Sequence, residues 1–187
     1  MSKIRIKGDT SGFVDLETSA TGSNLSVTGN ALKVDAINEK TAGNGVAIPG
    51  HVVQVQHKAV PSTTRTGVTT STSYVATGEY VDFTPKYANS TIYITITIGM
   101  QLANTNSGAC ITNIGRDGTM LGTGSYPIFM RDQTTVHYAP MAGTFVDTPS
   151  TTSAVRYEVY IRSSDGGQVF AIHESAYFSL VVTEVAQ

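Results

Sequence analysis

The pattern of apolar and polar residues changes near Pro49-Gly50. Beyond this point, apolar and polar side chains alternate over short segments, which is typical of half-buried strands. The clearest alternation runs from Thr91 to Leu102, where isoleucine occupies every second position from 92 to 98. Successive side chains of a strand point to opposite faces, so the isoleucines would share one face. No segment shows the apolar period of a helix. The pattern predicts an all-β region.

The predicted strands follow one another at short spacing, with turn residues between them. The principal segments are His51–Val60, Glu79–Thr84, Thr91–Leu102, Ala109–Arg116, Ile128–Arg131, Val155–Arg162, Gln168–Ile172 and Ser179–Val185, with Thr119–Gly122 and Ala142–Val146 as shorter candidates. Asp117-Gly118 is a strong hairpin signal. The apolar run from Leu180 to Val182 predicts a central place for the last strand. About eight or nine strands suit a two-sheet β-sandwich of the jelly-roll type.

Residues 1–50 have widely spaced apolar residues and frequent glycines, so any strands there are very short. A segment of this size rarely forms a stable core without disulfides, metal or oligomerisation. Within Asp35 to Ile48, the strongly apolar side chains are Ile37, Val46 and Ile48, and Gly43 to Gly45 forms a turn. A two-stranded hairpin is marginal alone in water. We therefore expect an intertwined β-stem shared between chains.

The composition limits the kinds of partner and environment expected for this chain. The net charge is −2 and the pI about 6.0, with no basic run to follow a phosphate backbone, so nucleic acid is not expected as a partner. The longest apolar-rich run, Ile92 to Leu102, is interrupted by threonine and is too short to insert into a membrane. No apolar segment follows Lys3 and Arg5, so we expect no secretory signal and assembly in a cytoplasm. A single cysteine, Cys110, excludes an intrachain disulfide.

Two stretches carry a resemblance to a known family. The first is Ile4 to Gly12, Ile-Arg-Ile-Lys-Gly-Asp-Thr-Ser-Gly, followed by the stem-like Asp35 to Ile48. The second is Phe145 to Arg162, a Pro-containing segment leading into an alternating run, together with the ending Ser179 to Gln187. These stretches resemble the trimeric fibre proteins of tailed bacteriophages, especially those of marine and cyanobacterial phages. In that family, such a segment feeds a long strand of a terminal β-sandwich.

The resemblance implies a homotrimer located in the virion, with three parts. Residues 1–34 would be the attachment segment, residues 35–50 the short trimeric stem and residues 51–187 the β-sandwich head. The apolar candidates for docking on the virion are Ile4, Ile6, Phe13 and Leu16. Family fibres often carry long repeated shafts, whereas this chain has room for only a rung or two. We therefore expect a short fibre.

Catalytic and metal-binding patterns are weak. Gly8 to Gly12 superficially resembles protease loops but matches none of them, and a polar turn is the simpler interpretation. The histidines, at positions 51, 57, 137 and 173, lack metal-ligand spacing. His51 or His57 could supply one ligand from each chain around a threefold axis, or could be a surface or interface histidine. No catalytic residue, metal or cofactor is predicted.

Acidic residues that could serve in glycan hydrolysis are Asp132, Asp147, Glu158, Asp165 and Glu174. Nothing in the sequence sets two of them at the separation that glycosidases require. Without tryptophan, the chain also lacks the usual platform for stacking on a sugar. An enzyme is therefore not expected.

The segment from Gly122 to Met141 combines aromatic and basic side chains with small polar residues on a predicted irregular loop. Such side chains suit stacking on sugar faces or a protein hot spot. The candidate receptor contacts are Tyr126, Arg131, His137 and Tyr138. Alternatively, Tyr126 and Phe129 pack between subunits and the loop seals the trimer.

The resulting hypothesis is a non-enzymatic virion protein, a short homotrimeric tail fibre that mediates host attachment through its C-terminal head. Its partners would be two further copies of itself, tail, baseplate or capsid proteins at the N-terminus, and a host-surface glycan or protein. An alternative is a decoration protein or head fibre on the capsid. A glycan-active tailspike is the third possibility.

Overall fold

A computed structural model describes residues 48–61, 66–103, 108–125, 127–131, 137–172 and 177–187, and it excludes the side chains of residues 60, 61, 66, 137 and 172. These residues form eleven strands and no helix, so the prediction of an all-β chain is confirmed for them. It follows that no described segment is a helix capable of spanning a membrane. The described residues all belong to one compact unit, Asn38–Gln187.

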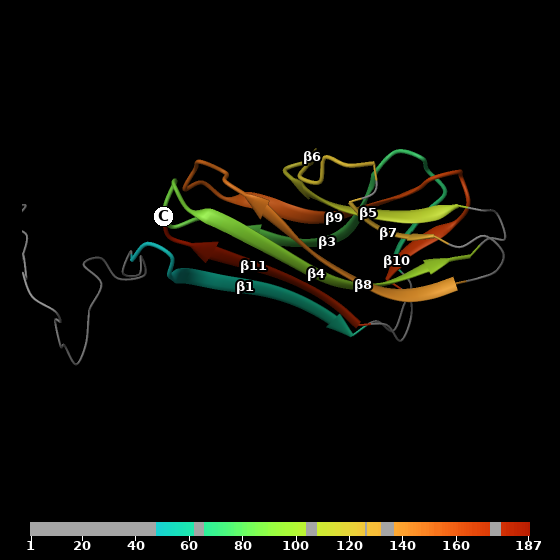
Figure 1. Cartoon of the computed structure of the whole chain (residues 1–187), viewed down its shortest axis with the longest axis horizontal. Coiled ribbons are helices and arrows are strands. Elements are labelled where there is room, and N and C mark those ends of the chain that lie inside the picture. Colours follow the sequence, from blue (N-terminus) through green and yellow to red (C-terminus); the bar gives the residue numbers. More distant parts are fainter. Residues whose placement is uncertain (1–47, 62–65, 104–107, 126, 132–136, 173–176) are drawn as a thin grey trace, which may run out of the picture. The chain divides into compact units, whose positions relative to one another are not determined.

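The strands are β1 (Val52–Pro61), β2 (Thr66–Thr69), β3 (Val75–Phe83), β4 (Thr91–Leu102), β5 (Ala109–Arg116), β6 (Thr119–Met120), β7 (Ile128–Arg131), β8 (His137–Asp147), β9 (Val155–Ser163), β10 (Val169–Ile172) and β11 (Tyr177–Val185). They form two antiparallel sheets (Figure 1). In sheet A the long strands lie in the order β1-β11-β4-β8, and β10 with β2 extends the sheet beside the end of β4. In sheet B the order is β3-β9-β5, and β6 and β7 share the far edge of β5.

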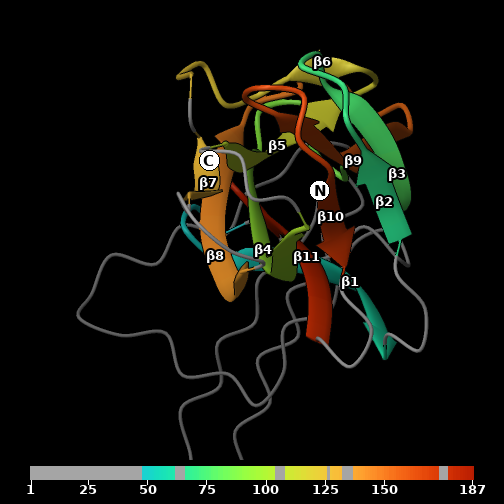
Figure 2. The same cartoon turned by 90° about the vertical axis from the view of Figure 1, so that its right-hand side faces the viewer.

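The two sheets lie face to face (Figure 2). Their buried side chains form one hydrophobic core. From sheet A, every second residue of β4 from Ile92 to Ile98 is fully buried, and Leu180 and Val182 of β11 lie beside them. From sheet B, Val159 and Ile114 complete the same cluster. Burial of such aliphatic side chains stabilises the fold by about 2 kcal/mol each.

Several predicted strands agree with the structure. The bounds of β4 and β7 match their predicted segments, and β11 lies centrally between β1 and β4. Asp117 and Gly118, with φ of 47° and 84°, make the two-residue turn between β5 and β6. The prediction of an irregular loop up to Met141 was wrong in part, because β8 begins at His137 and pairs with β4 over its whole length.

The outer face of sheet A is the side of β1, β11, β4 and β8 that points away from the core. Its residues follow from the register of the strands, which places every second side chain there. They include Val55, His57, Ala59, Tyr93, Thr95, Thr97, Tyr138, Pro140, Ala142, Thr144, Val146, Tyr177, Ser179, Val181 and Thr183. None of these described residues is Asp, Glu, Lys or Arg.

The outward side of sheet B differs, because it carries charged side chains. Arg156 on β9 pairs with Asp82 on β3 at 2.7 Å and lies 3.7 Å from the ring centroid of Tyr80. Arg162 donates a hydrogen bond to the carbonyl oxygen of Ser125 at 2.6 Å, which ties the segment after β6 to this sheet. The two sheets therefore present chemically different outer surfaces.

Glu184 is a fully buried carboxylate at the end of β11. It accepts hydrogen bonds from the backbone amides of Lys86 and Tyr87 at 2.9 and 3.0 Å, and from Ser90 Oγ and Gln54 Nε2 at 2.7 and 2.6 Å. Desolvation raises the pKa of Glu184, but these hydrogen bonds together outweigh it, so the pKa lies below its ordinary value. One side chain thus holds the connection between β3 and β4 against β1 and β11.

Replacement of Glu184 by glutamine should lower the free energy of unfolding by about 2 kcal/mol at neutral pH, because an amide cannot accept all four hydrogen bonds. Since the folded-state pKa is depressed, the carboxylate contributes fully above its ordinary pKa of 4.5 and loses its effect as the pH falls through the folded-state value. The difference between the wild type and the variant should therefore shrink in acid, as measured by chemical denaturation between neutral and acidic pH. Glu158→Gln, with the same charge change on the outward side of sheet B, is the control. A Glu184→Gln difference that is independent of pH would contradict this account.

Candidate functional site

The predicted receptor contacts lie beside the connection between β7 and β8. Arg131 is exposed at the end of β7, and Tyr138 is 52% exposed near the start of β8. Gln101 Nε2 donates a hydrogen bond to Tyr138 Oη at 3.3 Å. Tyr126 and the side chain of His137 lie outside the described residues. Arg131 and Tyr138, two of the four candidates, therefore lie on edge strands of different sheets. The connection between β7 and β8 joins these two strands.

Arg131 and His137, which flank this connection, lie at the end of the two sheets that is remote from Gly50. At the entry end, the amide of Gly50 donates to the carbonyl of Ala186 at 2.8 Å. At the opposite end, Leu102, where β4 ends, pairs with His137 and with Val169, where β8 and β10 begin. Arg131 and Tyr138 thus belong to the far end of the head.

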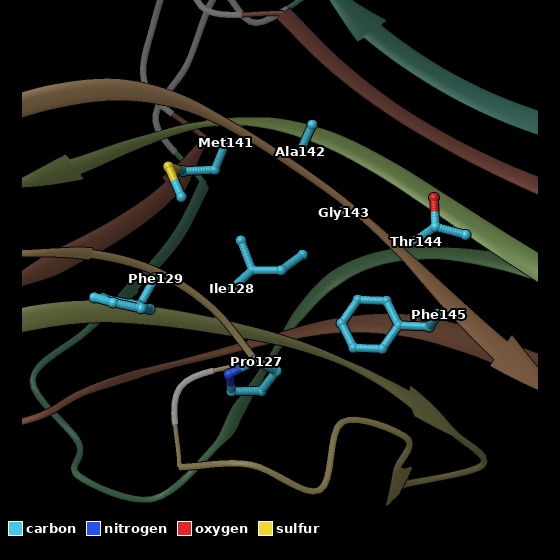
Figure 3. A pocket seen from close by; sticks show the side chains of 8 residues that line it. All are labelled: Pro127, Ile128, Phe129, Met141, Ala142, Gly143, Thr144 and Phe145. Carbon is cyan, nitrogen blue, oxygen red and sulfur yellow. The ribbon is translucent and has the colours of Figure 1, made fainter.

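A groove of about 260 Å³ lies along the edge of the molecule where β7 meets β8. Its lining residues are Pro127, Ile128, Phe129, Met141, Ala142, Gly143, Thr144 and Phe145. Figure 3 shows Ile128, Met141 and Phe145 directed into the space between the two strands, whereas Ala142 and Thr144 point away from it. Binding pockets for small molecules usually exceed about 300 Å³. The groove therefore suits no more than one apolar side chain or a similarly small group.

Gly143 allows β7 and β8 to approach each other at this groove. A Cβ atom at position 143 would lie 2.5 Å from Ile128 Cδ1 and 2.9 Å from Cγ1. Ile128 is 7% exposed, so its side chain fills the space that Gly143 leaves. Neither residue of this pair stands out in the sequence, because the contact forms only where the two edge strands meet.

A half-buried ionic cluster links the two sheets near the entry end. Arg116 Nη1 on β5 donates to both carboxylate oxygens of Asp147 on β8, at 2.8 and 2.9 Å, and Tyr157 Oη on β9 donates to Oδ2 at 2.8 Å. Desolvation, followed by the bond to Asp147, raises the pKa of Tyr157 above its usual range. Asp147 was one of the acids considered for glycan hydrolysis. Its carboxylate is engaged in joining β5, β8 and β9.

The other residues considered for catalysis or metal binding are buried, engaged in hydrogen bonds or not grouped together. Cys110 is buried, and burial raises its pKa to about 12, so the thiolate needed for nucleophilic chemistry is scarce. Asp165 accepts hydrogen bonds within the turn before β10. Within the described part of the chain, no three His, Cys, Asp or Glu side chains are grouped to hold a metal ion. Asp132, His173 and Glu174 lie outside it.

The predicted stem and docking residues are almost entirely outside the described residues. Ile37 and Val46 of the stem, and the docking residues Ile4, Ile6, Phe13 and Leu16, are among those not described. Ile48 is 37% exposed, and its carbonyl accepts a hydrogen bond from the amide of His51 at 3.0 Å. A role for Ile48 in a stem stays a prediction.

Comparison of the chain with protein-family models gives no match, and comparison with curated proteins gives none either.

Replacement of Gly143 by alanine should lower the free energy of unfolding by about 1–3 kcal/mol, because the new methyl group overlaps Ile128. The measurement is urea denaturation of the full chain. The matched control adds Ile128→Val, which removes the clashing Cδ1 atom, so the double variant should regain part of the loss. Strictly additive effects of the two substitutions would contradict the close packing described here.

Proposed function

We propose that the chain is a non-enzymatic structural protein of a phage virion, a short homotrimeric tail fibre whose head mediates attachment to the host. The observation that carries this proposal is the order of the principal strands, β1-β11-β4-β8 in sheet A and β3-β9-β5-β7 in sheet B. This order supports a jelly roll, an architecture common in viral capsid and lectin domains. A fold alone does not define a function, so the placement of candidate contacts supplies the second support.

The second support is the distance between the end where the chain enters the head and the end that carries the candidate contacts. The chain enters the head beside Ala186, whereas Arg131 and Tyr138 lie near the opposite end. An attachment protein needs this separation, because one end must face the particle while the other meets the host. The N-terminal region, with Ile4, Ile6, Phe13 and Leu16, would dock on tail, baseplate or capsid proteins. Several weak heads on one particle would then bind together through their high effective concentration.

Arginine and tyrosine at the far end suit a host-surface glycan or protein. The guanidinium offers a fork of donors, and the phenol combines an apolar ring with a hydroxyl group. The groove between β7 and β8 is lined by Phe129 and Phe145 and lies on the same pair of strands. It would accept one apolar group of a ligand held by Arg131 and Tyr138.

Alanine at Arg131 and Tyr138 together should reduce the adsorption rate of phage particles by about tenfold or more, because each hot-spot side chain is worth about 1–2 kcal/mol. Adsorption to host cells is the measurement, with the trimer verified by mass. Arg156→Ala is the matched control, since this exposed arginine lies near the entry end, and its removal should leave adsorption unchanged. Unchanged adsorption with the double variant would contradict the attachment role.

The location on the particle should be the tail. Antibody raised against the chain and carrying gold should label tails of intact virions under the electron microscope. Label on the capsid shell would instead support the alternative, a head fibre or decoration protein. Release of reducing sugar from host polysaccharide by the purified chain would contradict the non-enzymatic assignment.

A further inference from the structure

The outer face of sheet A combines exposed apolar and aromatic side chains with a complete lack of formal charge among its described residues. Across the four strands, the register aligns Val55, Thr183, Tyr93 and Val146 in one row. Val55, Tyr93 and Val146 are 55%, 40% and 56% exposed. Large apolar side chains thus lie next to one another on a surface that the single chain leaves open.

The next row toward the far end consists of His57, Val181, Thr95 and Thr144. The hydroxyl groups of Thr95 and Thr144 are 3.1 Å apart and share a hydrogen bond across the two strands. Surfaces that face solvent are usually rich in charged side chains of both signs. The centres of protein interfaces are depleted of charge and enriched in tyrosine. The outer face of sheet A has the composition of an interface centre, whereas the outward side of sheet B has that of a surface facing solvent.

The extent of the face also fits an interface. Four strands spaced about 4.8 Å apart, each about nine residues long, cover roughly 600 Å². A stable protein interface buries about 800 Å² on each partner, with a range that reaches down to about 600 Å². Burial of the whole face would therefore reach the lower end of this range.

We propose that the outer face of sheet A is the surface through which the heads of two or more copies of this chain contact one another. A second copy suits the face because a twofold axis in front of the face, or a threefold axis toward which the face points, brings this neutral surface against that of another copy. A strongly charged partner would find no ion pair there and would lose hydration. The proposal adds to the predicted stem a second contact within the head, and it does not depend on a role in the virion.

Thiol labelling of the full chain tests the proposal. Cys110 is fully buried and has a raised pKa, so an introduced cysteine would be the reactive one. Thr95→Cys places a thiol on the outer face of sheet A, and Thr119→Cys places one at an exposed position of β6 as the control. With a maleimide reagent, the thiol at position 95 should react about tenfold more slowly than the one at 119, and the two should react equally after denaturation. The mass of each sample is measured in parallel by analytical ultracentrifugation.

Each outcome separates this proposal from the proposed function. Slow labelling of an oligomer supports the interface. Equal labelling of an oligomer overturns it while leaving a stem-held homotrimer intact. Slow labelling of a monomer also overturns it, because another segment of the same chain would then cover the face.

A charge introduced into the face gives a second measurement. Thr95→Glu should weaken self-association by about tenfold or more, since each copy would bury an unpaired carboxylate. Thr119→Glu, with the same added charge, should leave association unchanged. Circular dichroism shows whether both variants keep the fold. Equal association of the two variants would overturn the proposal.

Discussion

The strict alternation of β4 is the constraint on which the rest of the described structure depends. β4 pairs with β8 on one edge and with both β11 and β10 on the other, so it sets the register of all of sheet A. Its isoleucines from position 92 to 98 are fully buried against sheet B. A slip of one residue would turn these side chains to the outside and bring Tyr93, Thr95 and Thr97 into the core. Because this exchange would expose the isoleucines to water, the register of β4 is fixed, and the strands that pair with it are fixed in turn.

The same alternation creates the outer face of sheet A. The inward isoleucines of β4 at 92, 94 and 96 are each followed by an outward tyrosine or threonine, and the paired strands β8 and β11 continue the outer face with neutral side chains. Core and candidate interface are therefore two sides of one set of strands. Charged side chains lie elsewhere, such as Arg156, which pairs with Asp82 outside sheet B, and Arg116, which pairs with Asp147 between the sheets. This separation of charged and neutral surfaces gives the head two distinct sides.

Sequence patterns predicted the parts of the fold that local residues determine. The alternation of β4, the Asp117-Gly118 turn and the apolar run of β11 each act within a few residues, and the structure confirms the strands that they predicted. The early start of β8 was missed because residues 137–141 gain strand structure from pairing with β4. The structural roles of Glu184 and Asp147 were not predicted, because their hydrogen-bond partners lie far away along the chain. At the candidate site, Arg131 and Tyr138 were predicted from the chemistry of their side chains. The groove at Gly143 could not be predicted, because it forms only where β7 and β8 meet.

The central claim is that the outer face of sheet A lies between copies of the chain. Its most direct test is the distance between spin labels in the full-length oligomer, measured by pulsed electron paramagnetic resonance. The account predicts that labels attached to Thr95→Cys lie closer to their counterparts in other copies than labels attached to Thr119→Cys. Labels at position 95 that are farther apart than labels at position 119 would show that the opposite side of the head faces inward, and would contradict the account.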